Sequence, residues 1–177
     1  MSSKLLQLLP ELDLINDHEL KKKTIACWLD AMEEGGWQID DLREIPFTLL
    51  IADTRISFLT HVQAVTQTAI ASAKILSQHY RQEFTLSMDL IVAGGLLHDI
   101  GKLLEYKKEN GRFVKSNNGK FLRHPFSGAN LAAKHQLPDE IIHIIATHAK
   151  EGDGGYRSPE AVVIHHADFM NFEPLRG

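Results

Sequence analysis

The chain has 177 residues, of which 44% are hydrophobic, and its formal net charge is −4 at pH 7. This length suits one domain that buries roughly 70% of the surface of its unfolded chain, and the composition argues against disorder. The net charge argues against a nucleic acid polymer as partner, and the apolar runs are too short to span a membrane. The single cysteine, Cys27, excludes an internal disulfide and favours a cytoplasmic location.

Apolar spacing and helix start signals predict helices joined by short loops. We expect helices over about 16–35, 53–76, 88–99, 126–133, 138–148 and 158–169. Asp53-Thr54 is expected to cap the second helix, and Gly101 to terminate the third. The large aromatic residues and Cys27 are expected in the core: Trp28, Trp37, Phe47 and Phe58.

A hairpin-like insert is expected between the third and fourth helices. Residues 111–115 and 120–123 flank Ser116-Asn117-Asn118-Gly119, and Asn-Gly is a preferred hairpin turn. The insert over 105–123 carries a charge of +4, which leaves −8 on the rest of the chain. Such an insert either attracts an anionic substrate or is simply a solvated loop. We divide the chain into an N-terminal helical extension, 1–52, and a core, 53–177, packed as one compact unit.

Six residues at wide intervals are candidate metal ligands. The doublet His98-Asp99 is preceded by one further candidate and followed by three: His61, His124, His148 and Asp168. Imidazoles combined with carboxylates suit first-row transition metals. Burying adjacent ionisable residues costs several kcal/mol each unless they are paired or ligated. The pattern therefore predicts a metalloenzyme, with ligands held on facing helices.

The order of these residues resembles the HD superfamily of metal-dependent phosphohydrolases, which is named after the His-Asp doublet. The resemblance covers about 55–172 and rests on four motifs: Gly-Leu-Leu-His-Asp-Ile-Gly-Lys (95–102), Arg-His-Pro-Phe-Ser-Gly-Ala (123–129), Ile-Ile-Ala-Thr-His (144–148) and His-Ala-Asp (166–168). It implies an all-α HD-domain helical bundle with the short hairpin-like insert. It also implies hydrolysis of a phosphomonoester or phosphodiester bond in a small phosphorylated compound or nucleotide.

The resemblance assigns roles to the candidates. The minimal one-metal site of the family corresponds to four of them: His61, His98, Asp99 and Asp168. His124 and His148 match the extra histidines of members that bind two metals, with Asp99 as the bridging ligand. The implied cofactors are two divalent transition-metal ions, either iron, manganese or zinc, with nickel, cobalt or magnesium as further candidates. A metal-bridging hydroxide would be the nucleophile.

Four residues are candidates for contact with substrate. Lys102, three residues after Asp99, is expected to contact a phosphate or the nucleophile and is counted with Asp99 as catalytic; its simpler role is a helix-end cation. Arg123 is the best phosphate ligand among the arginines. Arg55 either reaches a phosphate or stays solvated. His165 shares a helix face with Asp168 and either orients that carboxylate or touches substrate.

Other members of the superfamily offer alternatives. Cyclic di-GMP phosphodiesterases have a second histidine and then a glutamate where this chain has Ala149 and Lys150, which argues against that activity. Mixed-valent di-iron oxygenases share the same six-ligand order, so ligand identity does not separate them from hydrolases. Hydrolysis ranks first because it is the commoner use of the fold. A non-enzymatic signalling module ranks last because no ligand is missing. The metal, the substrate and the oligomeric state stay open.

Overall fold

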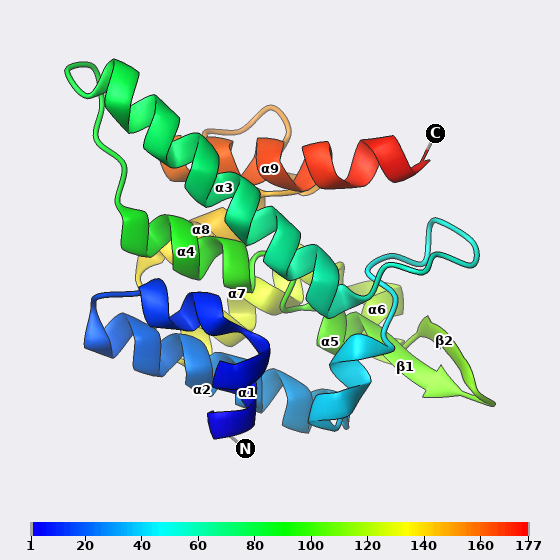
Figure 1. Ribbon diagram of the computed structural model, residues 1–177. Helices are drawn as coiled ribbons and strands as arrows, with labels where there is room; N and C mark the ends of the chain where they lie inside the picture. The colour runs from blue at the N-terminus through cyan, green and yellow to red at the C-terminus, as the bar shows by residue number, and fades with distance from the viewer. Residues whose placement is uncertain (1, 177) are drawn as a thin grey trace.

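A computed structural model describes residues 2–176 as a bundle of α-helices with one small antiparallel sheet (Figure 1). The elements follow in chain order: α1 (Ser2–Leu8), η1 (Pro10–Leu14), α2 (His18–Gly35), η2 (Ile39–Arg43), α3 (Phe58–Tyr80), α4 (Met88–Leu97), α5 (Lys102–Glu105), β1 (Tyr106–Glu109), β2 (Arg112–Lys115), α6 (Asn117–Phe121), α7 (His124–Lys134), α8 (Asp139–Thr147), η3 (Lys150–Gly152) and α9 (Pro159–Arg176). The all-α fold with a short hairpin is confirmed. None of the helices within residues 2–176 is long and apolar enough to cross a membrane.

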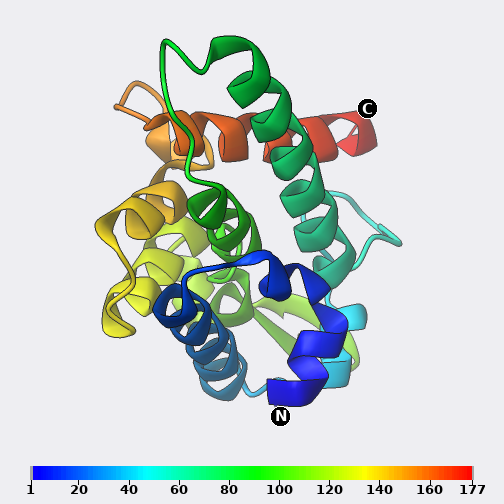
Figure 2. The same ribbon diagram turned by 60° about the vertical axis from the view of Figure 1, so that its left-hand side comes forward.

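Helix α4 lies in the middle of the bundle. Its residues from Ile91 to Leu97 are all buried and almost all apolar, which is the pattern of a helix enclosed by others. Helices α2, α3, α8 and α9 pack against it. Figures 1 and 2 show α3 and α9 on one side of α4 and α1 and α2 on the other. The residues that follow α4 are therefore delivered to the interior of the protein.

The first fifty residues share the hydrophobic core with the rest of the chain. Leu5 and Leu12 belong to the same cluster of buried side chains as Val62 and Ile164. The ring of Trp28 on α2 lies 5.7 Å from that of Phe58 at the start of α3. All four expected core aromatics are buried, as is Cys27. The division of the chain at residue 52 stays a prediction.

Helix α3 starts later than expected. Ser57, and not Asp53 or Thr54, is its N-cap, and the Ser57 hydroxyl accepts a hydrogen bond from the backbone N–H of Thr60. Asp53 has a left-handed backbone with φ of 54°, which suits a loop residue and not a cap of extended conformation. The Phe58 N–H also donates to Ile45 O over 2.7 Å, so the loop before α3 is tied to the end of η2.

The hairpin lies one segment earlier than predicted. Strand β1 pairs with β2, and the turn between them is Asn110-Gly111, with φ of 51° and 76°. Two consecutive left-handed residues are the geometry of a type I′ turn. The predicted turn at Asn118-Gly119 is wrong, because Ser116 caps a helix there. Gly119 serves close packing: a Cβ at this position would lie 2.2 Å from Glu105 O.

Candidate metal centre

The His-Asp doublet lies immediately after α4. We expected His98 inside a helix that runs to residue 99. The helix ends at Leu97, and His98 is its C-cap. Gly101 does not end α4 through a left-handed turn, because its φ is −63°. A Cβ on Gly101 would lie 2.1 Å from His124 O. The glycine therefore allows the first turn of α7 to approach the doublet.

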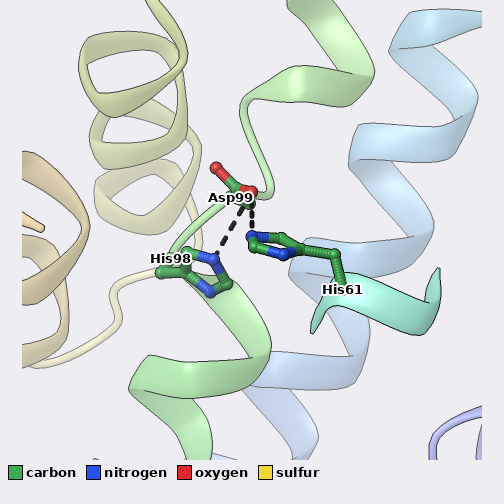
Figure 3. Close-up of side chains that lie close together, drawn as sticks. All are labelled: His61, His98 and Asp99. Atoms are coloured by element: carbon green, nitrogen blue, oxygen red, sulfur yellow. Dashed lines mark ion pairs between the residues drawn. The ribbon is translucent and has the colours of Figure 1, made fainter. Parts of the chain in front are cut away.

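One oxygen of Asp99 faces a first group of side chains. Asp99 Oδ2 lies 3.4 Å from Nε2 of His61, which belongs to α3, and 3.4 Å from Nε2 of His98 (Figure 3). Asp168 of α9 completes this group, with its Oδ1 3.0 Å from His61 Nε2 and 3.9 Å from His98 Nε2. Two imidazoles, from α3 and from the end of α4, thus lie at the same oxygen of Asp99, and the carboxylate of Asp168 lies beside both imidazoles.

The other oxygen of Asp99 faces a second group. Asp99 Oδ1 lies 3.2 Å from Nε2 of His124, the first residue of α7, and 3.6 Å from Nε2 of His148, the C-cap of α8. His148, like His98, follows its helix and is not inside it. The six predicted ligands are therefore brought together, and Asp99 is shared by two neighbouring groups that could each hold a metal ion.

Hydrogen bonds donated by Nδ1 orient three of the imidazoles. His98 Nδ1 donates to Gly95 O and His148 Nδ1 donates to Ile145 O, each over 2.7 Å. His124 Nδ1 bonds Glu105 Oε2 over 3.0 Å. A proton on Nδ1 leaves Nε2 with a free lone pair, and this arrangement is typical of metal-bound histidines.

The centre contains electron pairs that no described residue satisfies. His98 Nε2 and Asp99 Oδ1 are buried and have no hydrogen-bond partner within residues 2–176. His124 Nε2 and His148 Nε2 lie only 3.3 Å apart, although both carry lone pairs when Nδ1 holds the proton. Unpaired buried acceptors are costly, and a cation between them removes the cost. This donor set of imidazoles and carboxylates fits a divalent transition metal.

Burial and neighbouring charges set the ionisation of these groups. Burial lowers the pKa of His61, and it lowers that of His124 to about 4. Both imidazoles are then neutral at pH 7, as metal ligands must be. Burial alone would raise the pKa of Asp99, but Lys102 and His98 outweigh it and hold this pKa well below its usual range. Asp99 is therefore ionised.

The centre opens into a cavity of about 260 Å³, and two of the predicted substrate contacts line it. Lys102 Nζ donates to Asp99 Oδ2 over 2.5 Å and to Phe47 O over 2.7 Å. Arg123 Nε lies 3.3 Å from a carboxylate oxygen of Glu151. The basic side chains of Lys102 and Arg123 thus each have a carboxylate partner at the cavity, Asp99 and Glu151 respectively.

The other two predicted contacts have different positions. Neither Arg55 nor His165 is among the described residues that line the cavity. Arg55 is exposed on the loop before α3. His165 Nδ1 donates to His148 O over 2.6 Å, so the His165 ring binds the backbone carbonyl of a candidate metal ligand.

Sequence reasoning missed several residues of the site, among them Phe47, Glu105 and Glu151. Glu105 was grouped with the charged insert, yet only 2% of it is exposed. These residues occupy loops or element ends, where no helical or alternating pattern marks them. A motif search for ligands does not find them because they contact other side chains and backbone groups.

Residues 58–170 match the family model of the HD domain. The chain belongs to the HD domain family. It is 35% identical over 162 residues to dihydroneopterin 2′,3′-cyclic phosphate phosphodiesterase of Methanocaldococcus jannaschii. The alignment covers 87% of this chain and 63% of the relative. The chain thus spans less than two thirds of the length of that relative.

Part of the chain is also similar to ribonucleases Y from several organisms. The one from Desulforamulus reducens is 35% identical over 89 residues, which is 50% of this chain and 15% of the relative. The one from Thermotoga maritima is 31% identical over 97 residues, which is 55% of this chain and 16% of the relative. No solved structure matches the chain significantly.

Proposed function

We propose that this HD domain is a metal-dependent phosphohydrolase that cleaves a phosphodiester bond in a small phosphorylated compound. The observation that carries the proposal is the position of Asp99, whose two oxygens face two separate pairs of imidazoles. The proposed cofactors are two divalent cations, of iron, manganese or zinc. One would be held with His61, His98 and Asp168, and the other with His124 and His148.

The cations, when bound, would lower the pKa of water toward neutrality and offset negative charge on a phosphoryl oxygen. The side chains of the protein would bind the phosphate of the substrate. Arg123 lines the cavity directly before His124 and offers the planar donor pair that suits phosphate. Lys102, which also lines the cavity, holds its positively charged ammonium group against the carboxylate of Asp99. A phosphate would compete with Glu151 for Arg123.

The size of the cavity favours a small substrate. A volume of about 260 Å³ is near the lower end of the range for small-molecule sites. The relative from Methanocaldococcus jannaschii is named for a cyclic phosphodiester of a small compound. The ribonuclease Y matches cover about half of this chain. A nucleoside-sized 2′,3′-cyclic phosphate is therefore the first substrate to test.

The test uses purified protein loaded with manganese, iron or zinc. It should hydrolyse one or more nucleoside 2′,3′-cyclic phosphates, as followed by phosphorus NMR, and leave an RNA oligonucleotide intact. Asp99→Asn should lower the rate to background and keep the helical circular dichroism spectrum. The proposal fails if no phosphoester is cleaved with any of these metals, or if Asp99→Asn stays active.

The oxygenase alternative has no observation in its favour. The relatives named above carry names for phosphodiester or RNA cleavage. An oxygen electrode separates the two chemistries. Oxygen consumption by the iron-loaded protein, without release of phosphate esters, would replace hydrolysis by oxidation.

A further inference from the structure

His148 occupies the end of a helix, where the backbone has fewer internal partners. Helix α8 ends at Thr147, and the last carbonyls of a helix have no partner within it. The N–H of His148 donates to Ile144 O over 2.9 Å, and its Nδ1 donates to Ile145 O. These bonds hold the residue from the helix side. The chain that leaves His148 needs a different restraint.

Two side chains supply that restraint on three consecutive carbonyls. Arg157 Nε donates to Thr147 O over 2.7 Å, and its Nη2 donates to Ala149 O over 3.0 Å. His165 Nδ1 donates to His148 O over 2.6 Å. Every carbonyl from 147 to 149 therefore accepts a side-chain hydrogen bond, and the carbonyl of the candidate ligand lies in the middle.

The guanidinium of Arg157 is suited to this task. Its donors lie in one rigid plane, so two bonds to carbonyls on either side of His148 fix the direction of the peptides between them. The Arg157 side chain is only 15% exposed, and Asp153 Oδ1 accepts a further bond from Nη2. His165 lies on α9, three residues before Asp168. It links the helix of one candidate ligand to the backbone of another.

The equivalent segment after α4 is held differently. His98 is also a C-cap, but backbone bonds continue past it: Ile100 N–H donates to Leu97 O over 3.0 Å and Lys102 N–H to Asp99 O over 2.9 Å. Helical turns therefore position the doublet. After His148 the backbone bonds resume at Ala149, whose carbonyl accepts from the Gly152 N–H over 3.1 Å at the start of η3. The carbonyls of Thr147 and His148 before it are held by side chains.

We propose that Arg157 and His165 are positioning residues for the cation held by His124 and His148. By fixing the backbone around His148 they keep its Nε2 beside Asp99 Oδ1, without touching the cation or the substrate. This inference rests on the proposed function, because it requires a second cation. A role limited to capping α8 would stabilise the fold equally for both cations, and this difference makes the proposal testable.

The experiment counts manganese ions per chain by equilibrium dialysis and follows their coupling by electron paramagnetic resonance. Wild-type protein should bind two ions with a spectrum of a coupled pair. Arg157→Met should keep one tight ion, bind the second about 10- to 100-fold more weakly and give the spectrum of an isolated ion. His165→Leu should act in the same direction. Arg157→Lys, which retains a charged donor group but not the planar fork, should recover part of the affinity.

Two variants serve as matched controls. Arg81→Met removes an exposed arginine at the C-cap of α3, and His166→Ala removes the exposed histidine next to His165. Both should bind two coupled ions. Thermal unfolding is measured in parallel, and if Arg157→Met does not fold, His165→Leu and Arg157→Lys are judged by the same criteria.

Two outcomes overturn the inference alone. One is two ions of unchanged affinity in the Arg157 and His165 variants. The other is an equal loss of both ions with a lower melting temperature, which would assign these residues a general structural role. Wild-type protein that binds a single ion contradicts the two-cation function itself, so the two failures are distinguishable.

Discussion

The backbone N–H and the imidazole Nδ1 of His124 both bond the same carboxylate oxygen of Glu105, over 2.8 and 3.0 Å. Burial alone would raise the pKa of Glu105, but the hydrogen bonds from His124 outweigh it and lower this pKa. The ionised carboxylate therefore holds the ring with Nε2 directed at Asp99. Glu105 ends α5 directly before the hairpin, so the hairpin segment also supports the candidate metal centre.

Glu105→Gln should weaken the cation held by His124 and His148. The neutral amide is a poorer acceptor, and loss of such a supporting contact costs about 10- to 100-fold in metal affinity. Manganese titration measures the effect. Glu109→Gln, at an exposed position of the same hairpin, is the control and should leave both affinities unchanged. If wild-type protein, Glu105→Gln and Glu109→Gln bind manganese with equal affinity, Glu105 does not support the metal centre.

The residues that form the candidate centre could be predicted because metal chemistry restricts ligand types and because five of the six candidates lie in short motifs, with His61 as the exception. The structure brings all six together around Asp99, and their role as ligands stays a prediction. Glu105 and Arg157 could not be predicted in the same way. Each acts through hydrogen bonds to backbone groups 8 to 19 residues away, and such contacts depend on how the elements pack against one another.

The hairpin shows why local patterns have limits. Asn110-Gly111 and Asn118-Gly119 carry the same turn signal, and only the first forms the turn. The choice depends on the packing of Gly119 against the backbone of Glu105, which is a tertiary contact. The main helices were predictable because their apolar stripes face one core, whereas their first residues depend on loop contacts such as that of Phe58 with Ile45.

Gly101→Ala should destabilise the protein and disturb the centre together. The added methyl group would lie 2.1 Å from His124 O, so α7 must move away from Asp99. Overpacking of this kind costs about 1–3 kcal/mol, or roughly 2–12 °C in Tm for a chain of this size. Calorimetry and metal titration measure the two effects. Gly155→Ala, whose Cβ would have ordinary contacts, is the control. A Gly101→Ala protein with unchanged Tm would contradict the packing argument.

Cys27 should make stability fall at high pH. Burial raises the pKa of its thiol to about 12, whereas the thiol of the unfolded chain has a pKa near 9. The unfolded chain therefore releases this proton first, and stability is lost as pH rises through this window, by up to about 1.4 kcal/mol per pH unit. Urea unfolding from pH 8 to 11 measures the slope.

The control for Cys27 is Cys27→Ala, which keeps the other groups that titrate in this range. The slope of wild-type protein should be steeper than that of Cys27→Ala. Thiol labelling at pH 8 should also be slow in the folded protein, because the side chain is fully buried and protonated. Rapid labelling without unfolding would show that Cys27 is accessible.

Phe172 should contribute to the choice of substrate. It lines the cavity together with Phe169, and the ring of Phe47 contacts it edge-on at 6.1 Å. Phe172 follows Asp168 by four residues, which places it about 6 Å further along α9. A planar ring joined to a cyclic phosphate at the centre would span this distance, so the ring is expected to lie against Phe172.

Phe172→Leu should therefore lower kcat/KM for a nucleoside 2′,3′-cyclic phosphate about 2- to 12-fold, mainly through KM, as expected for loss of one aromatic contact. Glycerol 1,2-cyclic phosphate has no such ring, and its kcat/KM should not change. Phe121→Leu is the matched control, because Phe121 is 87% exposed. An equal loss for both substrates would show that Phe172 supports the centre and does not contact a ring. The ratio of the two losses thus decides whether α9 both carries a candidate metal ligand and selects the substrate.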